Sequence, residues 1–173
     1  MGWRQDTLSA MGDATFSIGT DASYSGQNFA IAAFVVHHNH VVYHQHIRAC
    51  SAHSSFNGEF LALYDTIAFM SASLIGWVLI IMDNLATMKA ATDNSTHSGF
   101  AISLNICKVL DHWFQKLTDN YLEIRWFPSH TDLIINEAAD TLAGSSFPFV
   151  CPKPITTTAS RKRTFMADTL HDW

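Results

Sequence analysis

The stretch 125–146, RWFPSHTDLIINEAADTLAGSS, joins the end of a short apolar run to a histidine, several acids and a small-residue helix pattern. A protein core normally excludes carboxylates, because an ionised side chain loses its hydration there. Further acids with apolar neighbours stand at Asp21, Glu59 and Asp83. This recurrence suggests that acids from distant parts of the chain serve one site.

The composition indicates one globular domain with a short appendage. The chain has 173 residues, 48% of them hydrophobic, which is enough for a substantial core. The longest apolar stretch, 69–82, contains polar residues and is shorter than the roughly 20 residues of a membrane-spanning helix. Three cysteines without CxxC spacing and a start without an apolar signal stretch favour a reducing compartment, so we expect an intracellular protein of the cytoplasm or nucleus, away from membranes.

The first third of the sequence predicts an antiparallel meander. Apolar and polar residues alternate over 15–21, as in a half-buried strand, and ASYSGQN (22–28) indicates a turn. Two runs rich in β-branched and aromatic residues, 29–37 and 41–48, surround the polar HHNH and predict a hairpin.

The rest of the sequence predicts helices alternating with strands, which gives an α/β fold of order β-β-β-α-β-α-β-α. Ser54, Ser55 and Asn57 are candidate caps of the first helix, and Gly144 is placed to end the last one. The predicted elements are a helix over 57–73, a buried strand over 78–82, a short helix over 84–91, a helix over 102–117, a strand over 121–127 and a helix over 134–144.

Three segments follow from this order. Residues 1–14 form an N-terminal extension, 15–146 form the folded domain, and 147–173 form a Pro/Thr-rich linker and C-terminal tail. The short basic run at 161–163 receives no assignment.

The strand order predicts where two of the acids lie. Strand 15–21 belongs in the middle of the sheet, with strand 78–82 parallel beside it through a right-handed crossover. Adjacent strands lie about 4.8 Å apart. Asp21 and Asp83, at the ends of these two strands, should therefore project from neighbouring points of one sheet edge.

Over residues 15–146 the sequence resembles the ribonuclease H family. The matching pieces, in order along the chain, are IGTDAS with Asp21, FNGEFLALYDTIAF with Glu59, VLIIMDN with Asp83, and WFPSHTDLIINEAADTLAGSS with His130 and Asp140. The last piece carries a W-x-P-x-H, N-E-x-A-D pattern similar to cellular type 1 enzymes and to retrotransposon polyproteins. The abrupt start of the chain and its Pro/Thr-rich linker favour a domain of the retrotransposon kind. The resemblance implies a ribonuclease H-like fold, a five-stranded mixed sheet with helices on both faces.

The resemblance also implies a metal-dependent endonuclease that cuts the RNA strand of RNA–DNA hybrids and leaves 3′-hydroxyl and 5′-phosphate ends. Asp21, Glu59, Asp83 and Asp140 would hold two Mg²⁺ or Mn²⁺ ions, and His130 would handle protons beside them. Elementary electrostatics agrees, because crowded carboxylates raise one another's pKa values unless divalent cations compensate their charge. In such a two-metal site the ions activate the attacking water and stabilise the leaving oxygen.

The expected partners are an RNA–DNA hybrid and a reverse transcriptase domain of the same polyprotein, with no small-molecule cofactor. Ser23, Asn57 and Asn84 are positioned to contact RNA 2′-hydroxyls in the wide minor groove. A net charge of −5 is unusual for a nucleic-acid binder, although bound metal would neutralise the acidic cluster. Residues 92–98 lack a basic protrusion, so we expect weak, salt-sensitive binding.

Simpler interpretations exist for each residue alone. Asp21 could open a turn, Asp83 could cap a helix, Glu59 could complement a helix N-terminus, Asp140 could lie on a solvated helix face, and His130 could be a surface histidine. Two other functions also remain open: a non-catalytic nucleic-acid-binding or subunit-docking module, and a nuclease for DNA junctions or duplex RNA.

Three departures from the family pattern bear on substrate fit: Gly58 stands where alanine is commoner, Asn84 where serine is usual, and Ile135 where glycine is usual. The histidines of 37–53 lack a third fixed ligand at tight spacing, so we interpret them as surface residues of the hairpin even though His44 and His46 share a strand face. The aromatic residues predicted to lie in the core are Trp113, Phe114, Trp126 and Phe127.

Overall fold

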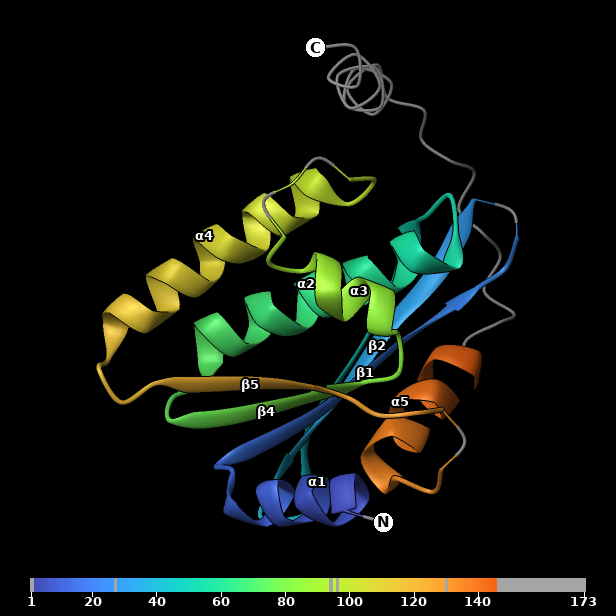
Figure 1. Cartoon of the computed structure of the whole chain (residues 1–173). Helices are drawn as coiled ribbons and strands as arrows, with labels where there is room; N and C mark the ends of the chain where they lie inside the picture. The colour runs from blue at the N-terminus through green and yellow to red at the C-terminus, as the bar shows by residue number, and fades with distance from the viewer. Residues whose placement is uncertain (1, 27, 94, 96, 130, 146–173) are drawn as a thin grey trace.

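A computed structural model describes residues 2–26, 28–93, 95, 97–129 and 131–145. One five-stranded sheet separates two layers of helices, with α2, α3 and α4 on one face and α1 and α5 on the other (Figure 1). Among the described residues, no helix is both long and apolar enough to cross a membrane. The elements are α1 (Gly2–Asp13), β1 (Phe16–Tyr24), β2 (Phe29–His38), β3 (Val41–Ser51), α2 (Ser55–Ser73), β4 (Trp77–Met82), α3 (Leu85–Ala90), α4 (Phe100–Lys116), β5 (Tyr121–Trp126) and α5 (Ile134–Ser145).

The sheet has the strand order β3-β2-β1-β4-β5, which confirms the predicted central position of β1. β1 pairs antiparallel with β2 and parallel with β4, and β4 pairs parallel with β5. Each parallel connection passes through a helical crossover, as parallel strands require. The carboxyl ends of β1, β4 and β5 therefore meet at the same edge of the sheet.

Two hydrophobic cores enclose the central strands. On the α2–α4 face, β1 and β4 contribute Ile18 and Ile80 to a core that includes Phe60 and the fully buried Trp113. On the other face, Leu79 and Ile81 of β4 pack with residues of α1, α5 and the loop after β5. Because β4 is covered on both faces, its sequence is a continuous apolar run rather than an alternating one.

Several boundaries differ from the predicted ones. β1 continues through Tyr24, so the predicted turn over 22–28 is wrong in its first three residues, which pair with β2. α5 continues through Ser145, so Gly144 lies inside the helix and does not end it. The sequence analysis also missed α1, whose residues lack a clear apolar stripe. Of the three candidate caps of α2, the structure selects Ser54, whose side chain accepts a hydrogen bond from the Asn57 N–H.

The aromatic residues divide into two groups. Trp113 and Phe127 are fully buried, as predicted. The core prediction is wrong for Phe114 and Trp126, which are 44% and 41% exposed. Phe114 lies on the outer side of α4, and Trp126 is the last residue of β5, an edge strand with one open side. Sequence periodicity alone does not show whether the end of a strand is covered by other elements or exposed to solvent.

Gly19 allows α5 to lie directly against β1. A Cβ atom at this position would lie 2.2 Å from the carbonyl oxygen of Ile135 in the first turn of α5. This separation is far below van der Waals contact, so a side chain here requires the helix to move. The glycine therefore sets how closely α5, and with it Asp140, approaches the strand that carries Asp21.

Gly19→Ala should lower the free energy of unfolding by about 1–3 kcal/mol, because the added methyl group overpacks the β1–α5 contact. Gly144→Ala is a matched control, since a Cβ there meets no described atom within 4 Å. It should be neutral or stabilise the protein by up to about 1 kcal/mol through helix propensity. Urea unfolding followed by circular dichroism measures both changes. Equal stability of the two variants would contradict the close contact.

Candidate metal centre

Asp21 on β1 and Asp83, the residue directly after β4, stand level with each other. The β1–β4 register pairs Gly19 with Ile81, and Asp21 and Asp83 each lie two residues further along the chain. Side chains alternate across a strand, so Asp21 shares the face of Gly19 and Asp83 shares the face of Ile81, both toward α5. The register therefore places two carboxylates side by side.

Glu59 reaches this point from the opposite layer of helices. β4 ends at Met82 while β1 continues to Tyr24, so the sheet is open beside Asp21. Two contacts press α2 against the central strands. The Thr66 hydroxyl donates to Thr20 Oγ1 at 3.1 Å, and Gly58 lies so close to β2 that a Cβ there would come within 2.9 Å of Ala30 Cβ. The glycine at position 58 thus has a packing reason.

The three carboxylates form a compact group. Asp21, Glu59 and Asp83 each offer an oxygen within 4.8 Å of the other two. Asp21 and Glu59 are each only 7% exposed, and Glu59 Oε2 is buried without a hydrogen-bond partner in the described part of the chain. An unpartnered buried carboxylate oxygen is costly. Three hard oxygen donors at this spacing could hold a divalent cation such as Mg²⁺ or Mn²⁺, which would satisfy that atom.

The electrostatics of the group follow from burial and mutual repulsion. Burial, followed by the charges of Asp21 and Asp83, raises the pKa of Glu59 well above its usual range. Burial, followed by the charge of Asp83, raises the pKa of Asp21 from 3.8 to about 6. The side-chain interaction between the two carboxyl groups lowers the pKa of Asp21 and raises that of Glu59. Without metal, Asp21 and Glu59 therefore bind protons more tightly than free carboxyl groups do.

Asp140 and His130 are the other predicted members of the site. Asp140 is exposed on α5 and lies outside the 4.8 Å group, but its charge contributes to the raised pKa of Asp21. It is therefore near the cluster, and its role as a fourth ligand stays a prediction. His130 lies outside the described residues.

The three polar residues predicted to contact substrate have different environments. Ser23 is half-buried on β1 and shares the strand face of Asp21. Asn57 lies in the first turn of α2, two residues before Glu59, so the two side chains leave the helix in different directions. The Asn84 side chain caps α3 by accepting a hydrogen bond from the Thr87 N–H at 2.9 Å.

The surroundings of Asp21, Glu59 and Asp83 argue against the simpler interpretation of each. Asn84, and not Asp83, caps the following helix. Asp21 lies within a paired strand and opens no turn. Glu59 lies beyond the first turn of α2, which contains no acidic residue. Three acids thus lack the local roles that could have explained them.

Sequence reasoning missed one residue beside the cluster. The indole Nε1–H of Trp126 donates to the backbone carbonyl of Asp83 at 2.8 Å. Strand alternation predicts only the face on which Trp126 lies and carries no signal for this bond.

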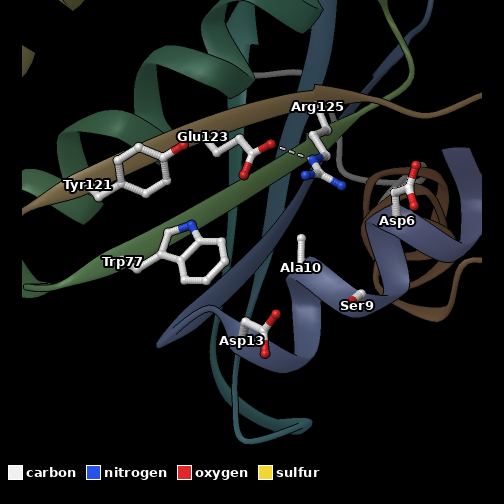
Figure 2. A pocket seen from close by; sticks show the side chains of 8 residues that line it. All are labelled: Asp6, Ser9, Ala10, Asp13, Trp77, Tyr121, Glu123 and Arg125. Carbon is white, nitrogen blue, oxygen red and sulfur yellow. Dashed lines mark hydrogen bonds and ion pairs between the residues drawn. The ribbon is translucent and has the colours of Figure 1, made fainter.

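Two grooves of the described surface are lined by residues outside the carboxylate cluster. One, of about 610 Å³, lies between α1, the beginning of β4 and β5 from Tyr121 to Arg125 (Figure 2). The second, of about 570 Å³, lies between α5 and Gln45 of β3. The side chains that line the first groove are Asp6, Ser9, Ala10, Asp13, Trp77, Tyr121, Glu123 and Arg125.

The histidines of the hairpin pack on aromatic rings. His44 stacks on Phe69 of α2 with ring centroids 4.4 Å apart, and His46 stacks on Phe34 at 5.0 Å. The two residues thus share one strand face, as their spacing predicts, and that face lies toward α2.

No protein-family model and no curated protein sequence matches the chain. Among solved structures, the fold is similar to that of LC11-RNase H1, which was isolated from compost by a metagenomic approach. The match has a TM-score of 0.57 and covers 76% of this chain and 94% of that chain at 15% sequence identity. The chain therefore has an α/β ribonuclease H-like fold, as the sequence predicts.

Because the pKa of Asp21 is raised, its carboxyl group should lower the free energy of unfolding as the pH increases. A carboxyl group that binds its proton more tightly in the folded state loses stabilisation as the pH rises from about 4 through about 6. In metal-free buffer, Asp21→Asn should raise the free energy of unfolding by about 1–3 kcal/mol at pH 8, with little effect at pH 4.

Urea unfolding at the two pH values, with a chelator present, measures this difference. Asp119→Asn removes an exposed acid that precedes β5, at the opposite edge of the sheet, and should change stability by less than about 0.5 kcal/mol at both pH values. A gain for Asp21→Asn that does not depend on pH would contradict the raised pKa.

Proposed function

We propose that the protein is a metal-dependent endonuclease that hydrolyses the RNA strand of RNA–DNA hybrids, leaving 3′-hydroxyl and 5′-phosphate ends. The convergence of Asp21, Glu59 and Asp83 at one edge of the sheet carries the proposal. The ribonuclease H-like fold and the four sequence pieces that resemble this family add support. The function is thus inferred from the site and its sequence pattern together.

The carboxylates would act as ligands and as a fixed frame for the scissile phosphate. Bound in a pair, Mg²⁺ or Mn²⁺ ions would lower the pKa of the attacking water and neutralise charge on the leaving 3′ oxygen. Asp21 is central because it lies close to both Glu59 and Asp83 and because the charge of Asp140 raises its pKa. The surrounding core keeps these side chains in place, so little reorganisation accompanies the reaction.

Asp140 and His130 complete the proposed machinery. Asp140 would bind metal from the solvent side, where its exposure permits exchange of ions and product. His130 would move protons to and from the attacking and leaving oxygens, a role suited to the unperturbed pKa of histidine. Both assignments rest on the resemblance of 126–146 to the family pattern.

Recognition of the hybrid would depend on polar contacts rather than on positive charge. Ser23 lies on the same strand face as Asp21, and its hydroxyl would contact a bound RNA strand there. Asn57 would contact a 2′-hydroxyl, and Asn84 would do so with its amide N–H groups, since its side-chain oxygen caps α3. With a net charge of −5, affinity should be weak and should fall steeply with salt.

We also propose a context for this activity. The W-x-P-x-H, N-E-x-A-D pattern supports a ribonuclease H domain over 15–146 from a retrotransposon polyprotein, with a reverse transcriptase domain as partner. The flanking segments 1–14 and 147–173 would then be an extension and a linker with its tail. Such a domain acts inside the cell, in the cytoplasm or nucleus.

Cleavage of a labelled hybrid in Mg²⁺ or Mn²⁺ tests the proposal. The wild-type chain should cut the RNA strand, and Asp83→Asn should cut at least about 100-fold more slowly, because the site loses one negative ligand. Asp119→Asn, remote from the cluster, should retain wild-type activity.

Substrate choice and metal dependence separate the alternatives. Hybrid, duplex DNA, duplex RNA and a branched junction are compared under the same conditions. Preference for any of the last three would overturn the substrate assignment. Hybrid binding without metal-dependent cutting would instead favour a non-catalytic binding or docking module.

A further inference from the structure

We infer that Trp126 is a positioning residue that fixes the metal ligand Asp83 through its indole N–H. The inference rests on the proposed metal site and extends it to a residue without a carboxylate. Its basis is the 2.8 Å hydrogen bond from Trp126 Nε1 to the Asp83 carbonyl oxygen.

The bond lies where the pairing of β4 and β5 ends. The ladder stops at Met82 and Trp126, and the Phe127 N–H adds a bond to the Met82 carbonyl at 2.8 Å. Pro128 follows and has no backbone N–H to donate. The Trp126 side chain thus extends the hydrogen bonding between the strands by one residue on β4, to Asp83.

This extension falls on a residue that lies among other carboxyl groups. Asp83 offers an oxygen within 4.8 Å of those of Asp21 and Glu59, and its charge raises the pKa of both. Asp83 lies between the end of β4 and the cap of α3 at Asn84, outside both elements. Holding its carbonyl restrains the peptide from rotating and carrying the carboxylate away from its neighbours.

Burial does not explain a tryptophan at this position. Trp126 is 41% exposed and belongs to neither of the hydrophobic cores that cover the two faces of the described sheet. β5 is an edge strand, and a smaller polar residue would suit such a site. The hydrogen bond to the metal ligand gives the indole a reason to be there.

Trp126→Phe tests the inference, because it keeps an aromatic ring and removes the indole N–H together with the ring that carries it. Trp77→Phe is the matched control: it makes the same chemical change at the other end of the sheet, where the buried indole nitrogen has no hydrogen-bond partner among the described residues. Calorimetric titration with Mn²⁺ and metal-free thermal unfolding are measured for the full chain and for both variants.

Trp126→Phe should weaken Mn²⁺ binding by about three- to tenfold, the range expected for loss of one hydrogen bond. Trp77→Phe should stay within about twofold of wild type. Hybrid cleavage by Trp126→Phe should need more Mn²⁺ for half-maximal rate and return to within about twofold of wild type at saturating metal. If Trp126→Phe does not fold, Trp126→Tyr, which also lacks the indole donor, takes its place.

The outcomes distinguish this inference from the proposed function. Unchanged Mn²⁺ affinity in Trp126→Phe, beside a wild type that binds, would overturn the role of Trp126 and leave the metal site standing. Equal weakening by both variants together with lower metal-free melting temperatures would also overturn it, because general packing would explain both. A wild type that binds no Mn²⁺ would overturn the proposed site and the inference with it.

Discussion

Folding of this chain has to overcome the repulsion among Asp21, Glu59 and Asp83. Folding brings the three carboxylates within 4.8 Å of one another and buries two of them, which is unfavourable without a compensating cation or proton. The β1–β4 register brings two of the acids level, and α2 brings the third. Apolar cores on both faces of the sheet supply the stability that holds these elements together against the repulsion.

The same repulsion links metal, protons and substrate. Because the pKa of Asp21 is raised, protons compete with a divalent cation for the cluster, so cation affinity should fall as the pH drops toward the raised pKa of Asp21. Binding of a cation relieves the unfavourable repulsion between the carboxylates of the folded protein, and this relief favours cation binding. The negative charge of the three carboxylates, which would destabilise an ordinary core, is here the source of affinity for the metal and, through the metal, for phosphate.

The sequence predicts the fold and the two strand-borne acids well because both follow from periodicity. Alternation and helical spacing give the element order, and the central position of β1 then requires Asp21 and Asp83 to be neighbours. Periodicity carries no information about a helix without an apolar stripe, so α1 was missed. Periodicity also does not show how closely elements pack, which depends on Gly19 and Gly58. Nor does it show whether one side of a strand is open to solvent, which determines the exposure of Trp126.

The most direct measurement is the anomalous X-ray scattering of Mn²⁺ in crystals of the full chain. We expect manganese peaks bounded by Asp21, Glu59 and Asp83, with metal–oxygen distances of about 2.0–2.3 Å and with Glu59 Oε2 bound to the metal. Crystals that contain Mn²⁺ but show no peak between these carboxylates, or show them turned apart around separate waters, would contradict it.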